Sequence, residues 1–178
     1  YIGAAPVPLG ILGNLAAAQV TLTITFDGER NGVAEQWSQT ETSLTSRDPL
    51  LAQFSSARTG SGAYTLEYAA VDGVDYDVDA DGRCESTTPE QDGLPDEFAP
   101  RRHPVEMLFG FAGGDKAGTE TIGGMEAVHY TFDERALGLA APTTAAGDVW
   151  VATTGGYIVR YSLVMDGPSP YVGKVSGR

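Results

Sequence analysis

Residues 118–167 read GTETIGGMEAVHYTFDERALGLAAPTTAAGDVWVATTGGYIVRYSLVMDG, and this stretch decides the expected fold. Two Gly-Gly pairs, Gly123-Gly124 and Gly155-Gly156, each lie between runs that are typical of strands. Glycine reaches positive φ without a Cβ clash, so both pairs predict tight hairpin turns. Between the hairpins, residues 133–138 begin with acidic residues and end at a glycine, which predicts one or two helical turns.

Apolar alternation extends this interpretation toward the N-terminus. Val20, Leu22, Ile24 and Phe26 alternate with threonines, as in a strand that has one buried face. Turn signals separate further strand-like runs at residues 33–44, 50–58, 64–70 and 74–78. Short strands with turn signals about every 8–12 residues indicate an antiparallel β architecture. We therefore predict a mainly β (α+β) fold.

Length and charge limit the class of protein. A chain of 178 residues is long enough to form one domain around its own core. Its 11 Lys and Arg against 24 Asp and Glu give a net charge of −13, so we expect no nucleic-acid partner, because phosphate binding needs clustered cations. The single cysteine, Cys84, excludes an internal disulfide.

The order of the motifs in residues 118–167 resembles the C-terminal half of the LolA/LppX/LprG-like proteins of bacterial envelopes. The shared pattern is G-x-E-x-I-x-G-x-x-A-x-H-Y, followed by G-x-V-W-V and then by G-Y-I-x-R-Y-x-L. The residues that carry the resemblance are Gly118, Glu120, Ile122, Gly124, Ala127, His129, Tyr130, Gly147, Val149, Trp150, Val151, Gly156, Tyr157, Ile158, Arg160, Tyr161 and Leu163.

The resemblance implies a curved antiparallel half-barrel sheet covered by a few short helices. In the best-known relatives, the space between sheet and helices holds lipid. We expect one such domain over residues 1–178, with an apolar N-terminal arm at residues 1–18 and an acidic rim loop at residues 77–102. The resemblance also implies an extracytoplasmic protein, either periplasmic or at the cell surface. Whether a segment outside this chain anchors it to a membrane is an open question.

A curved sheet under helices can pack solid or can leave an apolar cavity, and both alternatives stay open. Residues 103–111 suit a short helix, with Pro104 in the first turn and Gly110 as a stop, and they are more apolar than a surface helix needs. We expect this segment to be part of a lid. The residues expected to line the cavity or the lid are Met107, Leu108, Phe109, Phe111, Phe26 and Tyr68.

An acidic segment carries a candidate metal site. Residues 77–82 read DVDADG, the front half of a calcium loop, in which alternate carboxylates converge on the ion. The candidate ligands are Asp77, Asp79, Asp81 and Glu85. A complete loop has a bidentate Glu at its twelfth position, where this chain has Thr88, so Glu85 or Glu90 would have to replace it. The alternative interpretation is a solvated acidic loop without calcium.

Catalytic motifs are not recognised, and we expect no enzyme. The only histidines are His103 and His129, and His129 lies beside Tyr130 in an alternating run. A histidine near carboxylates can bind a metal ion or act as a base, but a hydrogen-bonded sheet histidine is the favoured interpretation.

Together these features predict a non-enzymatic binding protein for a hydrophobic or lipid ligand at the bacterial cell envelope. The alternative is a structural or interaction subunit of a larger membrane-associated assembly, stabilised by calcium through the acidic loop.

Overall fold

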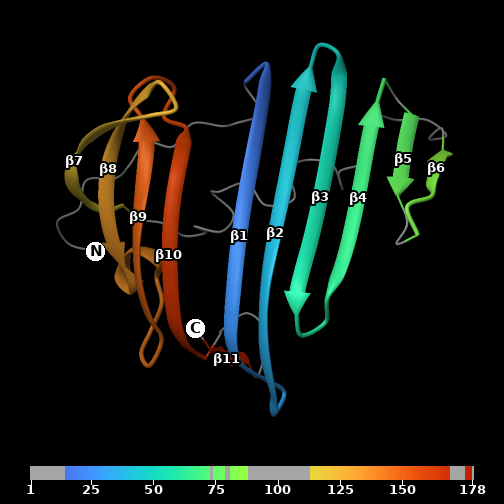
Figure 1. Cartoon of the computed structure of the whole chain (residues 1–178). Helices are drawn as coiled ribbons and strands as arrows, with labels where there is room; N and C mark the ends of the chain where they lie inside the picture. The colour runs from blue at the N-terminus through green and yellow to red at the C-terminus, as the bar shows by residue number, and fades with distance from the viewer. Residues whose placement is uncertain (1–14, 73, 79–80, 88–112, 169–174, 178) are drawn as a thin grey trace. The chain divides into compact units, whose positions relative to one another are not determined.

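The computed structural model describes residues 15–72, 74–78, 81–87, 113–168 and 175–177 (Figure 1). These residues form mostly strands, which pair antiparallel with their neighbours. The chain divides into two compact units. Among the described residues, 15–27 and 35–87 belong to the N-terminal unit, and 28–34 and 113–177 belong to the C-terminal unit.

The sheet of the N-terminal unit is a meander in which each strand neighbours the next in sequence. Its strands are β1 (Ala17–Arg30), β2 (Val33–Arg47), β3 (Leu50–Gly60), β4 (Tyr64–Val71), β5 (Val74–Val78) and β6 (Cys84–Thr87). The predicted alternation of residues 20–26 is confirmed, because apolar residues of β1 are half-buried and the intervening threonines are exposed.

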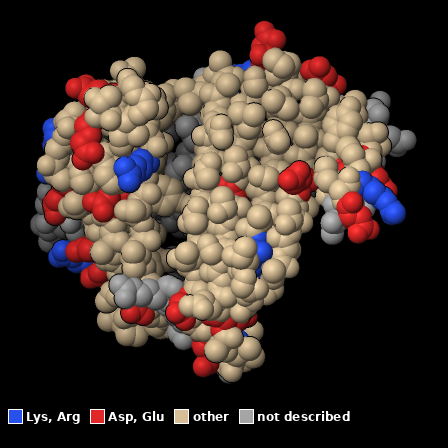
Figure 2. Space-filling view, viewed as in Figure 1, with Lys and Arg blue, Asp and Glu red and all other residues tan. Residues whose placement is uncertain are grey.

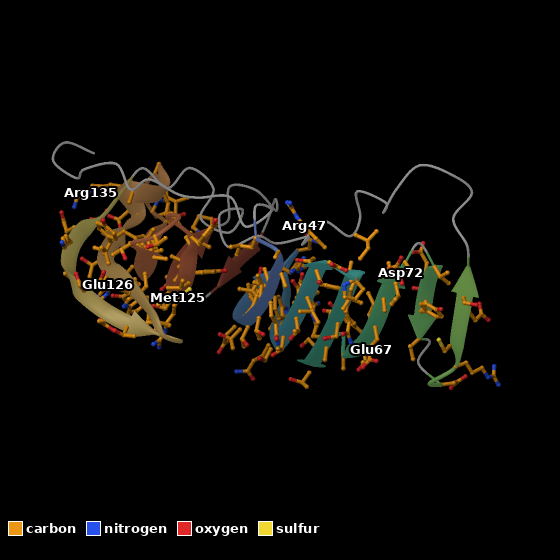
Figure 3. The ribbon with its side chains drawn as sticks, turned by 90° about the horizontal axis from the view of Figure 1, so that it is seen from above. Arg47, Glu67, Asp72, Met125, Glu126 and Arg135 are labelled. Atoms are coloured by element: carbon orange, nitrogen blue, oxygen red, sulfur yellow. The ribbon has the colours of Figure 1, made fainter. Side chains whose placement is uncertain are left out.

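This sheet has two chemically different faces. The apolar face carries Val20, Leu22, Ile24, Phe26, Trp37, Phe54, Leu66 and Tyr68, as the cross-strand register and the stacking of Phe26 on Trp37 establish. The threonine face carries Thr21, Thr23, Thr25, Thr40, Thr42, Thr59 and Thr65. Figure 3 shows Arg47 projecting on the side of the apolar face and Glu67 on the opposite side.

Charge is sparse over the middle of one face of this sheet, the face that Figure 2 turns to the viewer. Figure 2 shows few charged side chains over β1–β4 on the face turned to the viewer, whereas acidic side chains gather toward the strand ends. The buried apolar residues of the unit are Ala52, Tyr68 and Ala70, which form one cluster on the apolar face. Beside them lie the buried polar residues Gln39, Glu41 and Ser56.

The C-terminal unit contains a second antiparallel meander. Its strands are β7 (Asp115–Ile122), β8 (Met125–Asp133), β9 (Thr144–Ala152), β10 (Ile158–Pro168) and β11 (Val175–Gly177). Gly123 and Gly124 turn between β7 and β8 at φ values of 57° and 83°, and Gly155 and Gly156 turn between β9 and β10 at 82° and 69°. Both predicted Gly-Gly turns are therefore confirmed. β11 pairs with the end of β10 and with Gly28–Arg30 at the end of β1.

A single 3-10 turn, η3 (Glu134–Leu137), connects β8 to β9. Asp133 caps its start by accepting a hydrogen bond from the backbone nitrogen of Arg135, and Gly138 ends it in the left-handed conformation. This confirms the helical turn predicted for residues 133–138. Ala136 and Leu137 pack into the core of the unit, whose other buried members are Phe132, Ala145, Val149, Val151 and Ile158.

The mainly β, antiparallel prediction is confirmed, but the helical cover is not found among the described residues, where η3 is the one helical element. Ala17 and Ala18, at the end of the predicted N-terminal arm, already belong to β1, because the strand alternation continues through them. Among the residues that the structure describes, no helix has the length and hydropathy needed to cross a membrane. Residues 1–14 of the predicted arm and most of the acidic rim loop lie outside the described residues.

Candidate functional site

One row of ring and guanidinium contacts crosses four strands on the apolar face of the N-terminal unit. Phe26 on β1 stacks on Trp37 of β2, with ring centroids 5.4 Å apart. The guanidinium carbon of Arg58, on β3, lies 4.2 Å from the Trp37 ring centroid and 5.3 Å from that of Tyr64 on β4. Arg58 is therefore held between two aromatic rings, an arrangement that favours a cation over their faces.

A chain of side-chain hydrogen bonds fixes the same guanidinium group. Nε and Nη2 of Arg58 donate to Oε1 of Gln39 at 2.9 and 2.5 Å, and Nε2 of Gln39 donates to Oε1 of Glu41. Gln39 and Glu41 are only 3% and 8% exposed. Buried polar groups need such partners, because burying them unpaired costs free energy. Gln39 thus separates Arg58 from the carboxylate of Glu41.

Two hydrogen-bond donors beside the Arg58–Gln39–Glu41 hydrogen bonds have no acceptor within the described residues. The hydrogen bonds of Arg58 use Nε and Nη2, which leaves Nη1 without a partner. The indole nitrogen of Trp37 is buried and has no hydrogen-bond partner either. The buried Trp37 donor calls for an explanation, because most buried polar groups are paired.

The predicted ligand-binding residues that the structure describes lie on this same face. Phe26 is half-buried at one end of the row, and Tyr68 is buried against Ala52 and Ala70. The predicted lid residues Met107, Leu108, Phe109 and Phe111 lie outside the described residues.

The candidate calcium ligands lie on and near the β5–β6 hairpin. Asp77 and Glu85 are exposed and directly opposite one another across the two strands. Asp81 is exposed in the turn between them, and Asp79 lies outside the described residues. Opposed like charges repel, so a cation between Asp77 and Glu85 would relieve that repulsion. Within the described part of the chain, no group of three or more metal-binding side chains is preassembled.

A second row of contacts lies in the C-terminal unit, on the face opposite its core. His129 on β8 stacks on Trp150 of β9, with ring centroids 4.3 Å apart, and the guanidinium carbon of Arg160 on β10 lies 4.9 Å from the Trp150 ring. Nε2 of His129 lies 2.7 Å from Oδ1 of Asp148, and Nδ1 lies 3.4 Å from Oε1 of Glu120.

Both ring nitrogens of His129 face carboxylates, those of Asp148 and Glu120. The favoured interpretation of His129 as a hydrogen-bonded sheet histidine is therefore confirmed.

The most prominent residues of the apolar-face site, Arg58, Gln39 and Glu41, were not among the sequence-predicted site residues. The sequence did contain one signal for Arg58. Alternate residues of a strand point to the same face, and Arg58 is four residues after Phe54 in the same run, which predicts a cation on the apolar face of β3. Its partners follow only from the register that sets Arg58 opposite Gln39 and Tyr64.

The chain matches no protein-family model, no curated protein and no solved structure.

Proposed function

We propose that the protein is a non-enzymatic binding protein for an acyl-chain lipid and that the apolar face of β1 holds the acyl chain. The observation that carries this proposal is the column of Val20, Leu22, Ile24 and Phe26. All four side chains are half-buried on one face of one strand. Alternate residues of a strand are about 6.7 Å apart, so the column extends over about 20 Å. An extended acyl chain can lie along a column of this length.

The energetics favour a chain-like ligand. Each methylene group removed from water contributes about 0.8 kcal/mol, so a long alkyl chain along the column is stabilised in proportion to its length. The column also ends at Phe26, which stacks on Trp37 and so leads to the polar group of Arg58. An apolar track with a polar terminus suits an amphiphile better than a uniformly apolar molecule.

The family resemblance supports the same proposal from independent residues. Residues 118–167 resemble LolA/LppX/LprG-like proteins, whose best-known members hold lipid between a curved sheet and short helices. A half-barrel with a helical cover, and an extracytoplasmic place at the bacterial cell envelope, are parts of the proposal that rest on this resemblance. They can be tested separately from the binding itself.

A matched pair of variants tests whether the apolar face binds the ligand. Ile24→Gln places an amide in the apolar column, whereas Thr25→Gln places the same side chain on the threonine face. We expect Ile24→Gln to weaken binding of a fluorescent fatty acid to the delipidated protein about tenfold, and Thr25→Gln to leave binding unchanged. Circular dichroism verifies that both variants remain folded.

Equal binding by the two variants would contradict the proposed face. Native mass spectrometry after gentle purification tests the ligand class directly, and we expect a co-purifying lipid. A lipid-free protein that takes up no fatty acid and is recovered only within a complex would favour the alternative function, a structural or interaction subunit of an envelope assembly.

A further inference from the structure

We propose that the ligand carries an anionic head group and that Arg58 binds it; this inference rests on the proposed function. Arg58 is fixed in place before any ligand binds, because two rings enclose its guanidinium group and Gln39 accepts two of its hydrogen bonds. A preorganised guanidinium loses little conformational entropy when it binds an anion.

The position of Arg58 matches the end of the acyl track. Phe26 is the last apolar residue of the β1 column, and its ring stacks on Trp37, whose ring in turn lies under Arg58. A ligand whose tail lies along the column with its head at Phe26 therefore presents that head to Trp37 and Arg58. The head group and the tail are recognised by adjoining residues of one face.

The hydrogen-bonding capacity at this place fits an anionic oxygen group. Nη1 of Arg58 and Nε1 of Trp37 are donors without partners in the described residues. Both groups are donors only, so they can satisfy oxygen acceptors. Charge-assisted hydrogen bonds from guanidinium to carboxylate or phosphate are about twice as strong as neutral ones.

Gln39 keeps the positive charge of Arg58 available. An Arg58–Glu41 contact would neutralise the guanidinium directly, but the amide of Gln39 stands between the two groups. Arg47 is the natural comparison: it projects on the same side of the sheet but is exposed at the far end of β2 (Figure 3). A guanidinium group enclosed by rings and hydrogen-bonded to Gln39 is thus a feature of Arg58, and the exposed Arg47 on the same side does not share it.

The test compares four amphiphiles of one chain length: dodecanoate, dodecyl phosphate, dodecanol and dodecylamine. Displacement of a fluorescent fatty acid from the delipidated full chain measures each affinity. We expect dodecanoate or dodecyl phosphate, or both, to bind at least about tenfold more tightly than dodecanol, and dodecylamine to bind most weakly. The preference between the two anions distinguishes a fatty-acid carboxylate from a phospholipid phosphate as the head group.

Arg58→Met should abolish the preference for the two anions over dodecanol, and circular dichroism verifies that the variant is folded. Arg58→Lys keeps the charge but loses the planar fork, and should retain part of the preference. Arg47→Met should behave as the wild type. Equal affinity for anion and alcohol in the wild type, or a preference that survives Arg58→Met, overturns the inference alone. Failure of all four amphiphiles to bind overturns the proposed function and this inference together.

Discussion

The guanidinium carbon of Arg58 lies 4.2 Å from the centroid of the Trp37 ring, on the face of the sheet that also carries the β1 apolar column. The C-terminal unit repeats this pairing, with Arg160 at 4.9 Å from the Trp150 ring. Cation–π contacts contribute about 0.5–2 kcal/mol, depending on how far the cation is removed from water. In each unit the pairing ties neighbouring strands together on one face, and in the N-terminal unit the row leads to the apolar column of β1.

Trp150 should be a major contributor to the stability of the C-terminal unit. It is 8% exposed and lies between His129 and Arg160. Trp150→Ala is expected to lower the free energy of unfolding by about 3–5 kcal/mol, because it removes a large buried ring and leaves a cavity. Urea unfolding followed by circular dichroism measures the change. Val164→Ala, at a 50% exposed position of β10, is the control and should alter stability by less than about 0.5 kcal/mol.

Gly147 leaves space that the Phe132 ring occupies. The two residues are directly opposite across β8 and β9, and a Cβ at Gly147 would overlap the Phe132 ring and lie 2.5 Å from the carbonyl oxygen of Ser162. Gly147→Ala should therefore destabilise the protein by about 1–3 kcal/mol through overpacking. Gly118→Ala on β7 is the matched control, since its Cβ would meet no atom within 4 Å. Similar unfolding midpoints for the two variants would contradict this packing.

The carboxyl group of Asp133 should titrate at unusually low pH. The side-chain hydrogen bond from Arg135 is the largest cause that lowers the pKa of Asp133, and the backbone nitrogen of Arg135 adds to it. A lowered folded-state pKa means that this contribution to stability is present above the ordinary aspartate pKa and is lost as pH falls through the folded-state value. Carbon-detected NMR titration should find the Asp133 midpoint below the ordinary range, and Arg135→Ala should raise it. An unchanged midpoint in Arg135→Ala would show that the guanidinium is not the cause.

Calcium should stabilise the protein if the acidic hairpin binds it. Asp77 and Glu85 already oppose one another, and the sequence adds Asp79 and Asp81 between them. A ligand that binds only the native state raises the melting temperature, so millimolar calcium should raise it and Asp79→Ala should abolish the rise. Asp166→Ala, an exposed position on β10, should retain the full rise. The site is refuted if calcium produces no shift, or if the shift persists in Asp79→Ala.

Local patterns were sufficient to predict the elements that depend on neighbouring residues alone. The alternation at residues 20–26 predicted β1, and the Gly-Gly pairs predicted two turns, because both signals act within a few residues. The acidic start and glycine end of residues 133–138 likewise predicted η3.

The candidate site could not be predicted in the same way, because its contacts cross strands. Arg58 meets Trp37 and Tyr64 only in one register, and a slip by one residue would turn Arg58 to the threonine face. The contact of His129 with Glu120 also crosses strands, because Glu120 lies diagonally opposite it on β7, two residues from its direct partner Gly118.

The measurement that tests the central claim most directly is the affinity of the delipidated protein for saturated fatty acids of increasing length. Displacement of a fluorescent fatty acid by acids of about 8 to 16 carbons gives the free energy of binding as a function of chain length. If the column from Val20 to Phe26 buries the chain, each added methylene should strengthen binding by up to about 0.8 kcal/mol until the column is filled. An affinity that does not change with chain length, or no uptake at any length, would contradict the account.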